Sequence, residues 1–382
     1  MNFDFSAEQY AFRDSLKTLL EECFDPSMAI AAGADPAAVD GVWGRLAELG
    51  LFSVLVPESH DGLGLGFVDA ALLVETMGAA LVPPAVFDTL LVTDLVSRHG
   101  TQAQKSRLLP QLATGRLRAS IAAAEQFGFG AVAMRTRASN TGNIWTLDGS
   151  KILVPEADRA DLLLVAATTA DGVPGLFLLE QDPVSYSCRQ HETLDLTARY
   201  HAVDFRSVAL HDDALLGGSI GSEPVARLFD GAATIAALHL TGIAGWMFDT
   251  AVAYARTREQ FGKPIGSFQA IKHRCADMAV QLDVGRTAAY YAAWALAEGG
   301  EEQPRAASIA KSFCGDAARF ICNESIQVHG GMGFTWELGL HYPLRRAKVL
   351  EYAWGDAVFH RERLIAGIAG QTVHPSPAED AG

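Results

Sequence analysis

Two arginines beside a glycine turn near residue 260 are suited to binding an anion. The stretch 255–273 reads ARTREQFGKPIGSFQAIKH, with Arg256 and Arg258 at the expected end of a long helix. Cations are favourable there because the carbonyl end of a helix dipole is negative, which is a sufficient structural reason for both side chains. Arg258, however, precedes a glycine and proline turn and the start of a new helix, whose free N–H groups attract negative charge. Such a corner can hold a pyrophosphate.

A second glycine-rich stretch, QVHGGMGF at 327–334, has the composition of a ligand-binding loop. It follows an expected helix, so an ordinary C-cap and loop would explain part of it. Three glycines within four positions exceed what a cap requires, and bare backbone lets a flat or phosphorylated ligand approach closely. Gln327, Gly330 and Gly331 are therefore candidate binding residues.

Other nucleotide, hydrolase and metal motifs are incomplete or missing. The GLGLG segment at 62–66 lacks the spacing, βαβ context, parallel strands and ribose-binding acid of a dinucleotide fingerprint, so it is interpreted as a turn between helices. No GxxxxGK[ST], HExxH or GxSxG motif supports phosphoryl transfer, zinc hydrolysis or serine hydrolysis. The five cysteines are scattered, and they indicate neither a metal site nor a disulfide framework.

The composition is that of a folded, acidic protein. Its 382 residues are 49% hydrophobic and 20% charged, with a formal net charge of −15. The length suits two or three packed domains, and the acidity argues against a nucleic-acid partner. The N-terminus lacks the features of a secretory signal, and the apolar stretch 234–248 is interrupted by His239 and too short for a membrane span. We expect a cytoplasmic protein.

The elements that must position these motifs fall into three regions, which predict an α+β fold. Residues 1–117 have the apolar period of helices, beginning at the capping residue Ser6. Residues 118–218 hold short runs separated by turn pairs, typical of an antiparallel β-domain. Residues 219–369 predict a helical bundle, and the tail 370–382 is expected to be disordered. Within the bundle, one long helix should end at Gly262, before Pro264, and the next should be capped by Ser267.

The order of these regions and the two glycine motifs resemble the acyl-CoA dehydrogenase family over essentially the whole chain. The family's R-x-x-F-G motif is present at 258–262 and its Q-x-x-G-G-x-G motif at 327–333. The resemblance implies a C-terminal four-helix bundle, an FAD bound between subunits, and oxidation of an acyl-CoA thioester to the 2,3-enoyl form. It assigns to FAD binding the residues Arg258, Gln260, Phe261, Gln327, Gly330 and Gly331.

The catalytic elements of that family are altered. In the family a glutamate removes the α-proton, and the ungapped match of 345–359 places Trp354 at that position. The alternative position of the base, on the long helix, falls near Ala232. The family's TEPxxGSD loop is AEQFGFGAV here, with only Glu125 clearly retained, and its W-I-[TS]-N segment beside the flavin ring is ILVPEA.

The chain thus keeps the elements that reach the neighbouring subunit's FAD in the family and has lost those that serve its own flavin ring. We interpret it as the non-catalytic subunit of a heteromeric α2β2 acyl-CoA dehydrogenase. A homologous catalytic subunit would then bind the acyl-CoA, and an electron-transfer acceptor would take the electrons. Some bacterial enzymes of this kind oxidise bulky sterol-side-chain CoA esters, which is one substrate class that the resemblance offers.

Two alternatives stay open at this point. One is a self-sufficient dehydrogenase or related flavoenzyme whose base has moved to Asp356 or Glu351. A two-residue shift turns a helical side chain by about 200°, which disfavours Asp356 in regular geometry. The other is a flavin-free scaffold subunit, against which the retention of Arg258, Phe261 and Gln327 argues.

Overall fold

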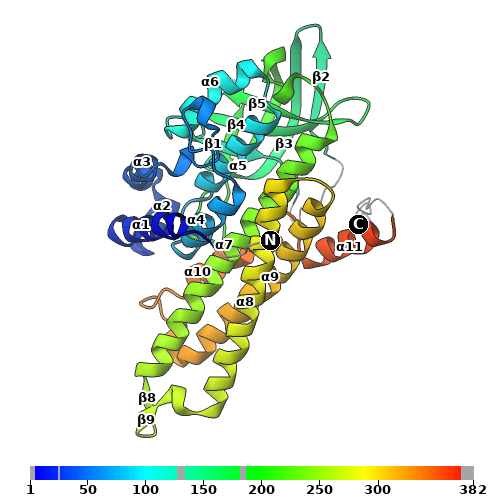
Figure 1. The fold of residues 1–382 in the computed structure, drawn as a ribbon. Helices are drawn as coiled ribbons and strands as arrows, with labels where there is room; N and C mark the ends of the chain where they lie inside the picture. Colours follow the sequence, from blue (N-terminus) through cyan, green and yellow to red (C-terminus); the bar gives the residue numbers. More distant parts are fainter. Residues whose placement is uncertain (1–4, 25, 127–133, 181–185, 371–382) are drawn as a thin grey trace.

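The computed structural model describes residues 5–24, 26–126, 134–180 and 186–370. Figure 1 shows an N-terminal group of helices beside a β-sheet, and a bundle of long helices that extends away from the sheet. The predicted order of helical, β and helical regions is confirmed. Residues 371–382, in the tail that was expected to be disordered, lie outside the described residues.

The N-terminal helices pack around one apolar core that continues into the bundle. Ser6 caps the first helix as predicted: its Oγ accepts from the Gln9 N–H at 3.2 Å, and the Gln9 side chain accepts from the Ser6 N–H. The GLGLG segment is a turn, with a short 3-10 helix before it and a longer helix after it. The helices are α1 (Ala7–Cys23), α2 (Pro26–Ala34), α3 (Asp40–Glu48), α4 (Phe67–Ala79), α5 (Pro84–His99) and α6 (Gln102–Ala113).

The predicted β-domain forms one seven-stranded sheet with its own apolar core. Four strand pairs are antiparallel, whereas β1–β4 and β2–β4 are parallel, so the sheet is mixed. Their order is β1-β4-β2-β3-β7-β6, with β5 beside β4. The strands are β1 (Ala119–Ala122), β2 (Arg137–Thr141), β3 (Ile144–Pro155), β4 (Leu162–Thr168), β5 (Pro174–Glu180), β6 (Ser187–Gln190) and β7 (Tyr200–His211).

The C-terminal bundle is built on one 36-residue helix. Its helices are α7 (Ser222–Thr257), α8 (Gln269–Glu298), α9 (Glu302–His329), α10 (His341–Tyr352) and α11 (Ala357–Ile368). The prediction that α7 ends at Gly262 was wrong: it ends at Thr257, because the chain reverses in a small hairpin, β8 (Glu259–Gln260) and β9 (Lys263–Pro264). The N-cap of α8 is Phe268 instead of Ser267, which lies in a 3-10 turn.

The apolar stretch 234–248 belongs to α7. That helix is long and apolar enough by composition to cross a membrane, so the argument from its short length was wrong. However, 89% of its most apolar window is buried inside the protein. Packing against the neighbouring helices therefore accounts for its apolarity.

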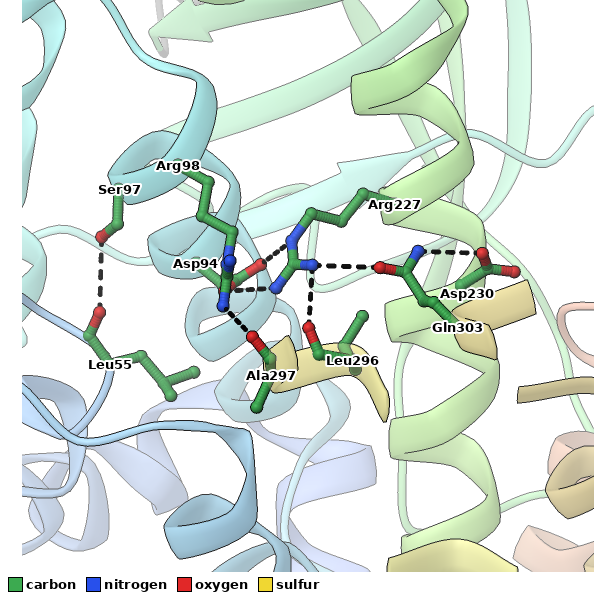
Figure 2. A network of polar contacts seen from close by, with 9 residues as sticks. All are labelled: Leu55, Asp94, Ser97, Arg98, Arg227, Asp230, Leu296, Ala297 and Gln303. Carbon is green, nitrogen blue, oxygen red and sulfur yellow. Dashed lines mark hydrogen bonds and ion pairs between the residues drawn. The ribbon is translucent and has the colours of Figure 1, made fainter. Parts of the chain in front are cut away.

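A buried arginine network joins α7 to the helices around it (Figure 2). Arg227 of α7 donates to both carboxylate oxygens of Asp94 on α5, at 2.7 and 2.9 Å. It also donates to the Leu296 carbonyl at the end of α8 and to the Gln303 side chain on α9. Gln303 in turn donates to Asp230. One side chain thereby satisfies groups from three other helices.

A second buried arginine connects all three regions of the chain. Arg346 of α10, fully buried, is ion-paired with Asp195, which is also fully buried in the segment between β6 and β7. It further donates to Thr197 Oγ1 at 2.8 Å and to the Val82 carbonyl, which lies between α4 and α5, at 3.2 Å. The bundle, the β-domain and the N-terminal helices meet at this guanidinium.

We predict that Arg346→Met will lower the free energy of unfolding by about 3–5 kcal/mol, because it leaves the Asp195 carboxylate buried without its charge partner. Urea denaturation of the full chain measures this. Arg345→Met is the matched control, since that side chain is partly exposed and makes only a 3.4 Å contact to a carbonyl and a 5.6 Å contact to an indole ring. Equal losses in the two variants would contradict the prediction, and adding Asp195→Leu to Arg346→Met should restore most of the loss.

Candidate functional site

The two glycine motifs, about 70 residues apart in sequence, meet at one end of the bundle. The ring of Tyr254, one turn before Arg258, lies 4.4 Å from the ring of His329, which stands between Gln327 and Gly330. Ser325, one turn before His329 on α9, donates through its hydroxyl to the Met247 carbonyl of α7 at 2.8 Å. These contacts bring the C-terminal ends of α7 and α9 together, so the R-x-x-F-G and Q-x-x-G-G segments share one surface.

The hairpin after α7 presents side chains to solvent. Phe261 and Gly262 form its turn with φ values of 55° and 74°, and the Phe261 side chain is 91% exposed. Arg258 stays in place through its backbone, which bonds to Tyr254 and Ile265. The Arg258 side chain is exposed and makes no hydrogen bond or ion pair with another described residue. It therefore keeps its donors for a ligand or a partner subunit.

The glycines after α9 differ in whether the fold itself requires a glycine at their positions. Gly333 is buried, and a Cβ there would lie 2.6 Å from the Ile326 carbonyl, so the fold itself requires a glycine. Gly330 has a φ of 59°, which favours glycine, whereas Gly331 lies outside the left-handed region. A Cβ on Gly331 would meet nothing within 4 Å. The fold therefore does not require a glycine at 331. A glycine there would be explained if a ligand or a partner subunit approached the backbone closely.

Gln327 and Gln260 are exposed at the same end of the bundle. The Gln260 amide donates to the Glu259 carbonyl at 2.8 Å, so its side chain is turned onto its own hairpin. Gln327 makes no side-chain hydrogen bond with another residue in the described part of the chain.

Trp354 lies in the loop between α10 and α11. The loop is tightly held, because the Lys311 ammonium donates to the carbonyls of Glu351 and Gly355 at 2.9 and 2.7 Å. His360 Nε2 lies 2.9 Å from the Trp354 carbonyl and is placed to donate to it. Burial lowers the pKa of Lys311 to about 7 and that of His360 to about 3, so the imidazole is neutral at physiological pH.

The two positions that the resemblance assigned to the catalytic base, Trp354 and Ala232, lie near each other in the fold. The Trp354 indole packs edge-on against Phe229 of α7, with ring centroids 6.4 Å apart, and Phe229 is one helical turn before Ala232. Phe359 adds a third ring, 5.6 Å from Phe229. Three aromatic rings thus cluster at the position that the resemblance assigned to the base.

The two alternative carboxylates are committed to other contacts. Asp356 caps α11 by accepting from the Phe359 N–H at 2.9 Å. Glu351 is buried and accepts from Arg319 and Lys348, at 3.1 and 2.8 Å. Neither arrangement leaves a carboxylate free to abstract a proton.

The retained Glu125 also has a structural role. Its carboxylate accepts from the buried Lys151 at 2.6 Å and from the backbone N–H groups of Arg135 and Thr136. Burial lowers the pKa of Lys151 to about 8, and although burial acts in the other direction on Glu125, the Lys151 charge lowers its pKa. Residues 127–132 of the AEQFGFGAV loop lie outside the described residues.

The ILVPEA segment, which the resemblance aligned with the family's segment beside the flavin ring, contains a buried acidic residue. Pro155 has no N–H, and its carbonyl accepts from Ser120 at 2.6 Å. Glu156 is buried in the left-handed region with a φ of 43°. Nearby Asp88 accepts from the Ile121 N–H, and burial, reinforced by the Glu156 charge, raises the pKa of Asp88 to about 7. Sequence patterns did not reveal this pair, because an acidic residue ordinarily indicates an exposed position.

Among the described residues, the end of the bundle at Arg258 has features that suit FAD. The exposed, uncommitted Arg258 and Gln327 beside open glycines suit an anionic, flat group. The ILVPEA segment of the β-domain offers one buried carboxylate, Glu156, and a proline that has no N–H to donate.

Comparisons with known proteins identify the family. The family model described as "Acyl-CoA dehydrogenase, N-terminal domain" matches residues 6–116, and "Acyl-CoA dehydrogenase, C-terminal domain" matches 223–369. The chain is 30% identical to the probable acyl-CoA dehydrogenase YngJ of Bacillus subtilis, over 94% of this chain and 98% of that protein. It is 35% identical to acyl-CoA dehydrogenase FadE34 of Mycobacterium tuberculosis, over 80% of this chain but only 39% of that protein.

A solved structure gives the same result. It is a variant of the Tcur3481-Tcur3483 steroid ACAD, which superposes with a TM-score of 0.86 and 28% identity over 95% of this chain and 98% of that chain. The two matched domains together cover more than half of the sequence. The chain belongs to the acyl-CoA dehydrogenase family of oxidoreductases, for which FAD is the expected cofactor.

Proposed function

We propose that this chain is the non-catalytic subunit of a heteromeric acyl-CoA dehydrogenase and that it lends FAD-binding residues to a homologous catalytic subunit. The observation that supports this most directly is the aromatic cluster of Trp354, Phe229 and Phe359 at the position of the base. The α-carbon of an acyl thioester is a weak acid, so dehydrogenation requires a carboxylate placed against it. The described residues offer no free carboxylate in this cluster.

The chain's contribution lies at the other end of α7. Arg258 would bind the FAD pyrophosphate of the partner's site, with Gln327, Gly330 and Gly331 approaching the adenosine end and Phe261 and Gln260 flanking them. When bound, FAD accepts the hydride from the β-carbon. Arg258 suits its part because the hairpin fixes its backbone while its guanidinium remains uncommitted.

The comparisons support a heteromer and suggest a substrate class. The similar solved structure is that of a steroid ACAD named for two proteins, Tcur3481 and Tcur3483. The similarity extends over nearly the whole of both compared chains. We therefore propose an α2β2 assembly that desaturates a bulky sterol-side-chain CoA ester bound in the partner's site, with the electrons passing to a separate acceptor. A cytoplasmic location is consistent with the burial of α7.

The first prediction concerns the chain without its partner. Purified alone, it should contain little FAD and should not oxidise acyl-CoA esters, because its flavin-ring segment is unsuitable and its base is missing. Flavin absorbance per chain and a dye-reduction assay measure both properties, before and after addition of the partner subunit. A homomer with one FAD per chain and steady turnover would contradict the proposal.

The second prediction concerns Arg258. In the assembled complex, Arg258→Ala should weaken FAD retention about tenfold or more, because a hydrogen bond to a charged group contributes about 1.5–3 kcal/mol. Dialysis followed by flavin measurement provides the test. Arg256→Ala is the matched control, since Arg256 lies two residues earlier and is also exposed. Equal FAD content in both variants would exclude the proposed contact.

The third prediction concerns Trp354. In a complex whose partner has lost its own glutamate, Trp354→Glu should not restore turnover. A placed base contributes about 10²–10⁴-fold only where substrate and flavin are held within reach, and the β-domain segment does not provide this. Trp354→Gln controls for the loss of the indole ring. Turnover restored by glutamate and absent with glutamine would show an intact half-site and would favour a self-sufficient enzyme.

A further inference from the structure

A cavity of about 760 Å³ lies between α1, α4, α7, α8 and α10, and nothing in the proposed function uses it. Its volume falls in the range of small-molecule sites, roughly 300–1,000 Å³. On α7 it is lined by residues 242–249. These are 13 to 20 residues beyond Phe229, or about 20–30 Å along the helix axis. The cavity is therefore separate from the aromatic cluster at Trp354.

Two glycines flatten the α7 wall, for different reasons. A Cβ on Gly242 would lie 2.0 Å from the Glu75 carbonyl, so the close approach of α4 and α7 requires that glycine. A Cβ on Gly245 would meet nothing nearer than 3.5 Å, where it would face Arg286 Nη2. Helix packing does not require a glycine at 245, and its absent side chain leaves Arg286 open to the cavity.

The polar end of the cavity presents a donor with spare capacity. Glu75 is only 13% exposed, and its carboxylate accepts from Arg286 Nε and Nη2, at 2.9 and 2.8 Å, and from the Tyr290 hydroxyl. The Glu75 carboxylate is thus satisfied. Arg286 Nη1, by contrast, makes within the described part of the chain only a 3.9 Å ion pair with the exposed Asp283. Among the described residues, Arg286 Nη1 therefore has no oxygen acceptor within hydrogen-bond distance.

The apolar part of the lining includes Leu20, Phe24, Leu72, Leu81, Tyr342 and Pro343. The lining also contains charges of both signs, with Arg13 and Lys17 as well as Glu21 and Asp249. Lys17 and Glu21 pair at 3.8 Å, and Arg13 is bonded to Asp14. Each of these two basic side chains therefore already has a carboxylate partner, whereas Arg286 keeps the Nη1 donor that Glu75 leaves unused.

We propose that this cavity binds an apolar, ring-bearing carboxylic acid. Its carboxylate would contact Arg286, and its rings would lie between Trp246 and the apolar residues of the lining. The aromatic residues of the wall suit a flat hydrocarbon body. The carboxylate would occupy the Arg286 donors that Glu75 leaves unused. This site is independent of FAD and of the partner subunit.

The test uses the full-length chain with 1-pyrenebutyrate and its methyl ester as probes, followed by energy transfer from tryptophan to pyrene. The acid should bind about tenfold more tightly than the ester, because only the acid offers a charged acceptor. Trp246→Phe should reduce the energy transfer while leaving the dissociation constant within about twofold. That pair of results places the probe beside Trp246.

Gly245→Leu should weaken binding of the acid at least about tenfold by filling the cavity in front of Arg286. Gly44→Leu on α3 is the matched control, because a side chain there meets open space. If Gly245→Leu fails to fold, Gly245→Ala, whose Cβ fits, should still weaken binding measurably. Equal affinity for acid and ester, or unchanged affinity in a folded Gly245 variant, would overturn the proposal.

Discussion

The arrangement of the three regions depends on the buried ion pair between Arg346 and Asp195. Each partner comes from a different region, and a third region contributes the Val82 carbonyl. Burying an unpaired charge is strongly unfavourable, so each of these side chains is stable in the interior only when it is paired with the other. This requirement makes docking of the regions cooperative, and it fixes how the sheet faces the bundle. Arg227 plays a similar part for the bundle, because its buried guanidinium donates hydrogen bonds to groups of α5, α8 and α9.

The loop at Trp354 is held through its backbone. Lys311 and His360 bond to the carbonyl of Glu351 at the end of α10 and to those of Gly355 and Trp354 in the loop, and none of these bonds involves the side chain at 354. Trp354 itself has a φ of 60°, in the left-handed region. Its indole ring packs against Phe229, which in turn contacts Phe359.

Local signals in the sequence were sufficient for much of the fold. Ser6 and the turn pairs between strands act over a few residues, so they could be read directly. Helix α5 has no clear amphipathic period because it is buried on nearly every face. The end of α7 was misplaced because the β8–β9 hairpin stops the helix before the Gly262 and Pro264 signals are reached. The parallel pairing of β1 with β4 depends on contacts between distant residues, which no local pattern records. For the site, resemblance supplied Arg258 and Gln327, but only the contact between Tyr254 and His329 explains why they share a surface.

The continuity of α7 has a consequence for assembly. Phe229 and Arg258 are 29 residues apart on or at the end of one unbroken helix, which separates them by about 44 Å. That distance separates the aromatic cluster at Trp354 from the guanidinium of Arg258 along the helix axis. Under the proposed function, the FAD that Arg258 contacts is therefore completed by another polypeptide. Cofactor loading is then a bimolecular equilibrium governed by mass action, and dilution of the subunits would release flavin even at saturating FAD.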